Sequence, residues 1–361
     1  MLALGIALLL AIQPIWPDRS AVGVTGALAL TLAAATRWQL RWLPVVVLIV
    51  CGLVLRMSVL GNEVSDVADV TRAAIMSMLD GGNPYGTGYE VSRPAGAPFP
   101  YGPIALLWYL PSLADPALIE LAVSVGLLLY FGVRAANGRP VGLAVFAVAP
   151  PLVLAAMDGS NDTSAGLLIL VALVAAAKRP LVGAGLLAVA VAFKPYAIAW
   201  LPPLVLWAGI PTLVAFAAVS LVAWAPVLFV WGPASYLRSL ALAQEAHLRS
   251  AYWSLGAIVD GFAPSAVGRA LETVRYFLSG AVAVLGGLRV RSIDGVIVVG
   301  TIAFLIAQFG GYFGSYVYVA AIAPILCWRA DDWLHRGLPD VASAYGSVPG
   351  VGRRLRRTAT G

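Results

Sequence analysis

The chain has little of what soluble enzymes use to build metal or redox sites. Its 361 residues include two cysteines and two histidines, and both cysteines, Cys51 and Cys327, lie in apolar segments. Two cysteines in apolar segments indicate neither a disulfide framework nor a cysteine-based metal site. Two histidines, His247 and His335, are too few for a histidine-built metal centre. We therefore expect neither a metal nor another cofactor.

Charge is also scarce. Charged residues make up 11% of the chain and hydrophobic residues 61%, with a mean hydropathy of +0.90. A soluble domain is about a quarter charged and about half apolar. This composition predicts an all-α polytopic membrane protein. The net charge of +6 is assigned to cytoplasmic loops and the tail, so we expect membrane lipids as partners and no nucleic acid.

Apolar segments of membrane-helix character recur along most of the chain. Because several are short for a crossing of about twenty residues, their boundaries are soft. No cleavable signal peptide is predicted, since the start MLALGIALLL lacks basic residues. The segments are 1–16, 21–36, 43–60, 116–134, 140–157, 163–177, 181–193, 196–208, 210–231, 275–288, 293–309 and 312–328.

The basic residues set the expected orientation. With the N-terminus in the cytoplasm, Arg134, Arg139 and Arg329 fall inside, as does the basic tail 329–361. This requires that 102–114, with Pro103 and Pro111, inserts only halfway. The prediction is about twelve crossings with both ends cytoplasmic. The polar stretches 61–103, 157–164, 193–196 and 232–269 then share the outer face.

The stretch 61–103 holds the densest polar chemistry between these segments. Ser65 or Asp66 is a suitable N-cap, and an apolar stripe at helical spacing follows. Gly81-Gly82 is suited to end the helix. We expect an amphipathic surface helix. Asp66 is a candidate general base or a helix-cap acid; Asp69 is the alternative base, or an ion-pair partner for Arg72.

Two cations interrupt apolar segments. Lys194, followed by Pro195, either snorkels to the interface or holds an anionic headgroup beside a broken helix. We favour the second interpretation. A charge inside a membrane segment is costly unless it faces a cavity or a partner, and such charges often mark functional sites. Arg56, at the outer end of 43–60, either snorkels or holds a phosphate, and snorkelling is the favoured interpretation.

Other polar residues have an ordinary interpretation beside the functional one. Asp158, Asn161 and Asp162 form either a solvated turn or a substrate contact. His247 is interpreted as a loop histidine. The aromatic residues Tyr101, Trp108 and Tyr109 are assigned to an interfacial belt, although aromatic faces also stack on sugars.

The order of these motifs resembles that of a known family. Asp66, Ala73-Ala74, Gly82-Asn83-Pro84-Tyr85 and Tyr101-Gly102-Pro103 resemble the first outer loop of bacterial GT-C fold glycosyltransferases. The nearest resemblance is to polyprenyl-phosphate-mannose-dependent α-mannosyltransferases. Gly159 with Asn161 or Asp162, Lys194-Pro195 and Ser254-Leu255 resemble later motifs. The resemblance covers roughly residues 40–328 and favours Asp66 over Asp69.

The resemblance implies an inverting transfer of a sugar, with mannose favoured, on the extracytoplasmic face of a bacterial plasma membrane. The donor is a polyprenyl-monophosphate sugar, and the acceptor is a cell-envelope glycolipid, lipoglycan or polysaccharide. Asp66 is the implied base, and Lys194 is the implied phosphate ligand, together with Arg56 or Arg249. The candidate substrate contacts are Asn83, Tyr85, Tyr101, Asn161, Asp162, His247, Trp253 and Ser254.

Two non-enzymatic alternatives remain open. A transporter or flippase of lipid-linked sugars would use the same polar residues, but it should show paired broken helices, and the sequence indicates one break, at Lys194-Pro195. A non-catalytic membrane protein of envelope assembly is the other alternative.

Overall fold

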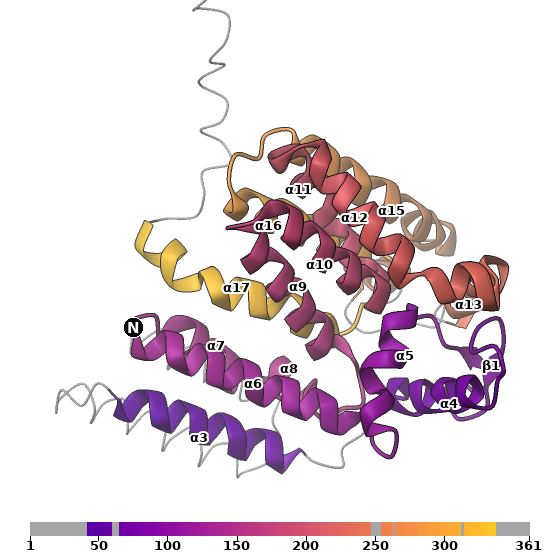
Figure 1. The fold of residues 1–361 in the computed structure, drawn as a ribbon, viewed down its shortest axis with the longest axis horizontal. Helices are drawn as coiled ribbons and strands as arrows, with labels where there is room; N and C mark the ends of the chain where they lie inside the picture. Colours follow the sequence, from indigo (N-terminus) through magenta and orange to yellow (C-terminus); the bar gives the residue numbers. More distant parts are fainter. Residues whose placement is uncertain (1–41, 60–64, 247–253, 263, 312–313, 337–361) are drawn as a thin grey trace, which may run out of the picture.

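The computed structural model describes residues 42–59, 65–246, 254–262, 264–311 and 314–336. This part of the chain is mostly helical, and its strands form one short antiparallel pair (Figure 1). The predicted segments 1–16 and 21–36 lie outside it. The α-helices are α3 (Leu43–Ser58), α4 (Val67–Leu79), α5 (Pro103–Tyr109), α6 (Ala117–Ala136), α7 (Val141–Val148), α8 (Pro150–Leu154), α9 (Asp162–Ala176), α10 (Pro180–Phe193), α11 (Leu201–Ala208), α12 (Ile210–Ala223), α13 (Pro233–Ala246), α14 (Leu255–Asp260), α15 (Ser265–Gly287), α16 (Ile293–Phe309) and α17 (Val317–Arg336). The remaining elements are β1 (Gly88–Tyr89), β2 (Ala97–Pro98), two 3-10 helices, η2 (Leu110–Ser112) and η3 (Pro195–Trp200), and the π-helical turn η4 (Val227–Trp231).

The apolar segments predicted from the sequence coincide with helices throughout the described part. By length and composition one described helix, α6, is able to cross a membrane, and α3, α9, α10, α12 and α16 are apolar but shorter. The segment 102–114 forms the short helices α5 and η2 rather than one long helix. Helix content is therefore as predicted, while the number of crossings stays a prediction.

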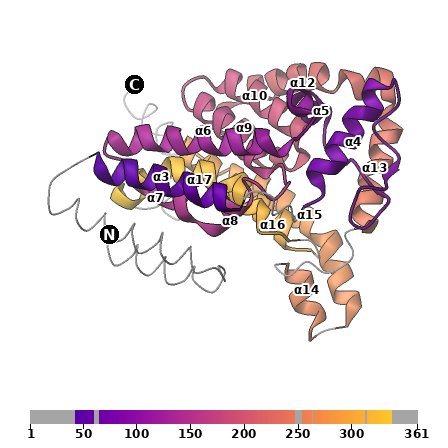
Figure 2. The same ribbon diagram turned by 90° about the horizontal axis from the view of Figure 1, so that it is seen from below.

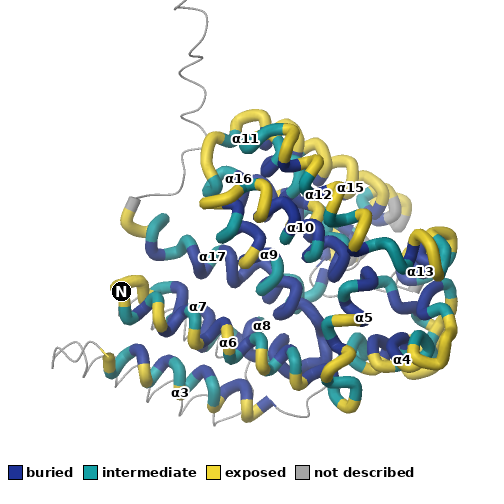
Figure 3. Tube along the Cα trace, viewed as in Figure 1, coloured by how far each residue is buried: buried dark blue, intermediate teal, exposed yellow. Residues whose placement is uncertain are grey.

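The helices α9 and α10 form the centre of the molecule. Helix α10 packs between α9 and α12, and α9 packs against α17 on its other side (Figures 1 and 2). Leu173 of α9 and Leu187 of α10 are fully buried, and Figure 3 shows these two helices largely buried while the outer faces of α11 and α15 are exposed. Burying such side chains is the main stabilisation available to these packed helices.

Two boundaries differ from the prediction. The stretch 232–269 was expected to be an outer loop, but α13, α14 and the first turn of α15 occupy most of it. Helix α13 has little apolar character, which is why it resembled a loop, and it forms because Tyr236 and Ala243 pack inward. Helix α17 continues past 328 to Arg336, because its polar end forms ion pairs with other helices.

These ion pairs gather at one end of the molecule. The Arg329 guanidinium binds Asp294 of α16 at 2.6 and 2.9 Å and Asp332 at 2.9 Å. Asp331 accepts hydrogen bonds from the N–H groups of Val141 and Gly142, at the start of α7. A carboxylate is favourable there because the helix dipole is positive at that end. Figure 1 shows this end at the left and α4, α5 and β1 at the right.

Arg56 neither snorkels nor is placed to hold a phosphate, which corrects both interpretations of it. Its side chain is 0% exposed. The guanidinium donates to Ser124 Oγ of α6 at 2.6 Å and to the carbonyls of Gly52, Phe146 and Ala147 at 2.9–3.2 Å. It also lies 5.0 Å from the Phe146 ring centroid. With these donors occupied, Arg56 joins α3, α6 and α7.

Candidate functional site

Helix α4 begins on top of the turn that precedes α9. The N–H of Ser65 donates to the Asp158 carbonyl at 2.7 Å, and that of Ala68 donates to the Gly159 carbonyl at 2.8 Å. Gly159 has φ +81°, and a Cβ there would lie 2.7 Å from the Ser65 carbonyl oxygen. Only glycine permits this approach, so the loop 65–103 and the turn 158–161 are fixed to one another.

Asp66 occupies the N-cap position of α4, as predicted, but its carboxylate does not cap the helix. Instead Oδ2 accepts a 2.5 Å hydrogen bond from the backbone N–H of Arg93, and Ser65 Oγ caps the Val67 N–H at 3.3 Å. Asp66 is half-buried, whereas Asp69 is exposed and, of the ion pairs among described residues, takes part in none with Arg72. Of the two acids, Asp66 is the one that the fold positions.

Lys194 lies at the break between α10 and η3. Because Pro195 disfavours helical geometry in the residue before it, Lys194 is extended, with φ −142° and ψ 111°. The chain is held there by Gly102, whose N–H donates to the Phe193 carbonyl at 3.2 Å. A Cβ on Gly102 would lie 2.0 Å from the Ala192 carbonyl oxygen. The loop before α5 therefore packs directly on the break.

The Lys194 ammonium is buried and paired. It lies 2.8 Å from Asp162 Oδ2 and donates to Asn161 Oδ1 at 2.6 Å, and the side chain is 6% exposed. Asp162 Oδ1 also accepts from the Tyr196 hydroxyl at 2.7 Å. Three predicted site residues, Lys194, Asn161 and Asp162, thus meet in one cluster. A buried charge requires such partners, because desolvation without them is costly.

Aromatic rings enclose this ammonium. Its nitrogen lies 5.1 Å from the ring centroids of Tyr101 and Tyr196 and 5.9 Å from that of Tyr318. Cations are attracted to the faces of aromatic rings at such distances. Tyr101 is therefore a wall of this lysine cage rather than a member of an interfacial belt, while its contact with a substrate stays a prediction.

Tyr101 also connects Lys194 to Asp66. Burial raises the pKa of the Tyr101 hydroxyl well above its ordinary value, and the neighbouring carboxylates of Asp162 and Asp66 raise it further. Both carboxylates therefore lie within electrostatic range of one phenol. Backbone hydrogen bonds give the same link: Ser65 and Ala68, which flank Asp66, donate to the turn 158–159, and Asn161 at the end of that turn accepts from Lys194.

The turn between α8 and α9 adds a buried acid, Asp158, that is 2% exposed. Its carboxylate accepts from the Ser160 N–H at 2.8 Å and from the Tyr316 hydroxyl at 2.7 Å. Burial raises the pKa of Asp158, although these hydrogen bonds oppose the shift. The prediction of a solvated turn is wrong, because α4 and α17 cover it.

Several other predicted contacts prove to be structural. Asn83 donates to the Trp231 carbonyl at 2.8 Å and accepts from the Tyr85 N–H at 3.0 Å, which fixes the turn. Tyr85 is buried, with its ring centroid 5.3 Å from that of Tyr236. Ser254 is buried beside α14. His247, Arg249 and Trp253 lie outside the described residues.

Sequence reasoning missed Glu120, a buried acid near the start of α6. Its carboxylate accepts from the Tyr109 hydroxyl at 2.5 Å and from both the hydroxyl and the N–H of Ser164. Trp108 Nε1 donates to the same Ser164 hydroxyl at 3.0 Å. Trp108 and Tyr109 therefore point into the protein, which corrects their assignment to an interfacial belt. The sequence did contain a signal for Glu120, since an acid inside an apolar segment requires a partner.

A second missed group is Arg275 on α15. It is 7% exposed, pairs with Glu272 and donates to the Ala307 carbonyl at 2.9 Å, while its Nε has no partner among the described residues. A Cβ on Gly311 would lie 2.7 Å from that Nε.

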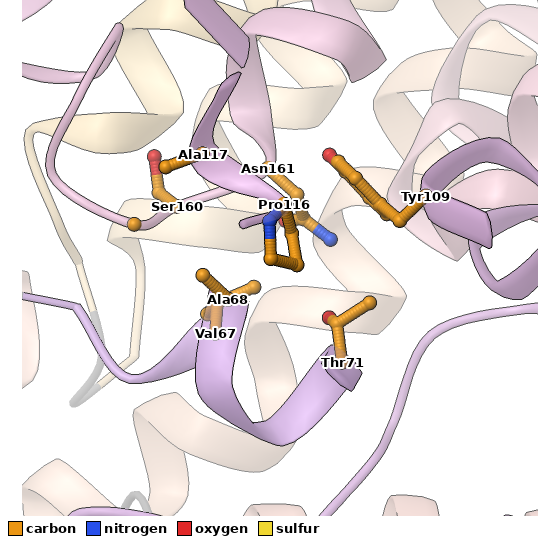
Figure 4. Close-up of a pocket in the computed structure, with 9 residues that line it drawn as sticks. Val67, Ala68, Thr71, Tyr109, Pro116, Ala117, Ser160 and Asn161 are labelled. Carbon is orange, nitrogen blue, oxygen red and sulfur yellow. The ribbon is translucent and has the colours of Figure 1, made fainter. Parts of the chain in front are cut away.

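A small hollow lies between α4, the N-terminus of α6 and the turn 159–161, with an empty volume of about 170 Å³. Figure 4 shows its lining. This volume includes open solvent, and the hollow has no room for a water molecule, so it is not a ligand pocket in this structure. The lining residues are Val67, Ala68, Thr71, Tyr109, Pro116, Ala117, Gly159, Ser160 and Asn161.

No family model, curated protein or solved structure matches this chain. In the described residues, no cluster of three or more histidine, cysteine or acidic side chains is arranged to hold a metal ion.

Proposed function

We propose that this protein is a GT-C type membrane glycosyltransferase that transfers a sugar, with mannose favoured, from a polyprenyl-monophosphate donor to a cell-envelope glycolipid or lipoglycan. The observation that carries the proposal is the packing of the loop around Asp66 on the turn 158–161, whose Asn161 binds the Lys194 ammonium. Asp66 is a half-buried carboxylate and Lys194 a caged ammonium. A base and a phosphate ligand on one side of an apolar helical protein are what such a transfer needs.

Exposed apolar side chains support the membrane location that this function requires. Phe229 and Val230 of η4 and Val222 of α12 are 75–78% exposed. Many further large apolar side chains on α3, α6 and α15 are also exposed. A soluble monomer rarely exposes so many large apolar side chains. Lipid is the medium that favours it.

In the proposed reaction Asp66 takes the proton of an acceptor hydroxyl. The acceptor oxygen then forms a bond to the anomeric carbon of the donor, with inversion. The bond between that carbon and the phosphate oxygen breaks, and the lipid phosphate leaves with the electron pair. The Lys194 ammonium stabilises the charge that develops on the phosphate.

Arg275 is the second cation that we assign to the phosphate, in the place that the sequence suggested for Arg56. Its buried Nε has no partner among the described residues, so the guanidinium keeps one donor for a phosphate oxygen. Arginine suits phosphate because its donors match the geometry of the oxygens. The bond to the Ala307 carbonyl holds the guanidinium in place.

The test is sugar transfer by purified protein, with radiolabelled polyprenyl-phosphate-mannose and an extract of membrane glycolipids. Asp66→Asn should lower the rate by about 10²–10⁴-fold, which is typical for loss of a general base. Asp69→Asn is the matched control, because Asp69 is three residues away and exposed. Equal rates in wild type and Asp66→Asn would remove the base assignment. If the wild-type protein transfers no sugar, the proposed glycosyltransferase activity is disfavoured.

A transporter of lipid-linked sugars is the second candidate, because the structure contains a further helix break. Helices α7 and α8 are separated at Ala149, which is extended with φ −66° and ψ 121° before Pro150. The sequence had indicated one break, and paired breaks are a transporter feature. Movement of labelled lipid across proteoliposomes, with no transfer to any acceptor, would favour this candidate.

A further inference from the structure

Helix α9 begins without a hydrogen bond from the side chain of its own N-cap residue, Asn161. From this position an asparagine oxygen normally accepts from the N–H of the second or third helical residue. Here the Asn161 Oδ1 accepts from the Lys194 ammonium instead, at 2.6 Å. The N–H groups in the first turn of α9 have no acceptor within the helix, so they need one from elsewhere.

Glu120 of α6 supplies that acceptor. Its Oε2 accepts from the N–H of Ser164, the third residue of α9, at 3.0 Å. Its Oε1 accepts from the hydroxyls of Ser164 and Tyr109. Glu120 is 2% exposed and Ser164 0%, so this N–H is shielded from water. A carboxylate is also favoured at the positive end of the helix dipole, and Glu120 therefore caps α9 from the neighbouring helix.

This external cap leaves the Asn161 oxygen available to Lys194. Without Glu120 the buried N–H of Ser164 would be unpaired, which is costly. The N-cap side chain is the ordinary acceptor for that N–H, so the Asn161 amide would turn towards it. Its oxygen would then leave the ammonium, and of the two contacts through which Asn161 and Asp162 hold Lys194 only the one to Asp162 would remain.

We infer that Glu120 is a positioning residue for Lys194: by capping α9 it keeps the Asn161 side chain turned to the ammonium. The inference rests on the proposed function, in which Lys194 binds the donor's phosphate, and deepens it by naming what sets the lysine. The position of the ammonium is measurable without any substrate, so the two proposals are tested separately.

The sequence contains two lysines, so the ammonium can be followed directly. Lys178 is exposed and Lys194 is buried. The folded protein in detergent is treated with limiting acetic anhydride, and mass spectrometry gives the acetylation of Lys194 relative to Lys178. Glu120→Met removes the acceptor at similar length, and Glu120→Gln keeps one oxygen for the Ser164 N–H. If Glu120→Met does not fold, Glu120→Asp replaces it, because the shorter side chain draws the carboxylate away from that N–H.

Asp331→Leu is the matched control. Asp331 is 3% exposed and accepts from the N–H groups of Val141 and Gly142 at the start of α7. This variant therefore also removes a buried acid that caps a neighbouring helix, at the end of the molecule opposite α4 and α5 (Figure 1). An increase in acetylation through general destabilisation would appear in both variants.

Glu120→Met should raise the relative acetylation of Lys194 by about tenfold, the worth of one hydrogen bond to a charged group. Glu120→Gln and Asp331→Leu should stay close to wild type. In an Asn161→Ala background, Glu120→Met should add no further increase, because the residue through which it acts is gone. Affinity for farnesyl phosphate should fall by about tenfold in Glu120→Met as well.

Three results would make Glu120 a structural cap only and overturn the inference, while the proposed function stands. They are unchanged acetylation in Glu120→Met, an equal rise in Asp331→Leu, and a further rise when Glu120→Met is added to Asn161→Ala. If acetylation changes as expected but wild type binds no farnesyl phosphate, Glu120 positions Lys194 and the phosphate role in the proposed function fails.

Discussion

The ammonium of Lys194 and the carboxylate of Asp162 lie 2.8 Å apart, both almost fully buried. The pair connects the start of α9 to the break after α10, and the Tyr196 hydroxyl and the Asn161 amide complete its hydrogen bonds. Buried pairs of this kind cost much to desolvate and are costly to break. The Lys194–Asp162 pair therefore contributes to the stability of the fold and, in the proposed function, to the site.

Removing one member of this pair should destabilise the protein strongly. We expect Lys194→Met to lower the free energy of unfolding by about 3–5 kcal/mol, because Asp162 is left buried and charged. The double variant Lys194→Met with Asp162→Leu should recover most of that loss and still fail to bind a polyprenyl phosphate. Denaturation in micelles and lipid binding are the measurements. Retained lipid binding in the double variant would remove Lys194 from the phosphate site.

Arg56 should matter for stability and not for the substrate. Arg56→Leu leaves the Gly52, Phe146 and Ala147 carbonyls without their donor, so we expect a loss of about 3 kcal/mol or more. Affinity for a lipid phosphate, measured on the folded fraction, should equal that of wild type. A selective loss of affinity at unchanged stability would return Arg56 to the phosphate site.

The glycines at the two loop contacts should resist substitution. Gly102→Ala and Gly159→Ala should each lower the melting temperature, because the added Cβ would lie 2.0 and 2.7 Å from a carbonyl oxygen, which forces the loop away. Gly126→Ala in α6 is the control: nothing lies within 4 Å of its Cβ position, so it should raise stability by up to about 1 kcal/mol. Equal effects at all three positions would mean that the loop is not packed this way.

Asp158 should make stability depend on pH. Its pKa is raised in the folded protein, chiefly by burial, so the folded state holds that proton more tightly than the unfolded state. The resulting stability is fully present below the ordinary aspartate pKa of about 4 and is lost as the pH rises through the raised value. The melting temperature of Asp158→Asn should therefore rise relative to that of wild type as the pH rises from 4 to about 7. The opposite trend would mean that the hydrogen bonds from Ser160 and Tyr316 outweigh burial.

Capping, glycine and proline signals in the sequence predicted those parts of the site that depend on neighbouring residues. The N-cap at Asp66 and the glycines after residue 80 predicted α4. Pro195 predicted the break at Lys194, because such constraints act over a few residues. Asn161 and Asp162 were selected for their polarity, and the structure brings them to Lys194. That contact spans 33 residues, so spacing along one helix could not have predicted it.

The missed parts depend on partners distant in sequence. Arg56 resembled a snorkelling cation because its acceptors on α6 and α7 lie 68–91 residues away. Glu120 was not predicted as a site residue, although a charge inside an apolar segment needs a partner whether it is an acid or, as at Lys194, a cation. Helix α13 was predicted as a loop because Ser, Arg, Gln and Glu interrupt its apolar residues, and its Tyr236 packs against Tyr85 of the first loop.

The single guanidinium that joins α3, α6 and α7 also bears on how the protein is made. In the membrane location proposed above, α3 leaves the ribosome before α6 and α7 are synthesised, and until Ala147 has emerged Arg56 has no carbonyls outside its own helix to bind. A lone arginine is poorly tolerated in lipid. Helix α3 must therefore wait at the insertion machinery or at the bilayer surface, so stable integration of this helix is expected only after roughly the first 150 residues have been translated, an order of assembly that truncated nascent chains would reveal.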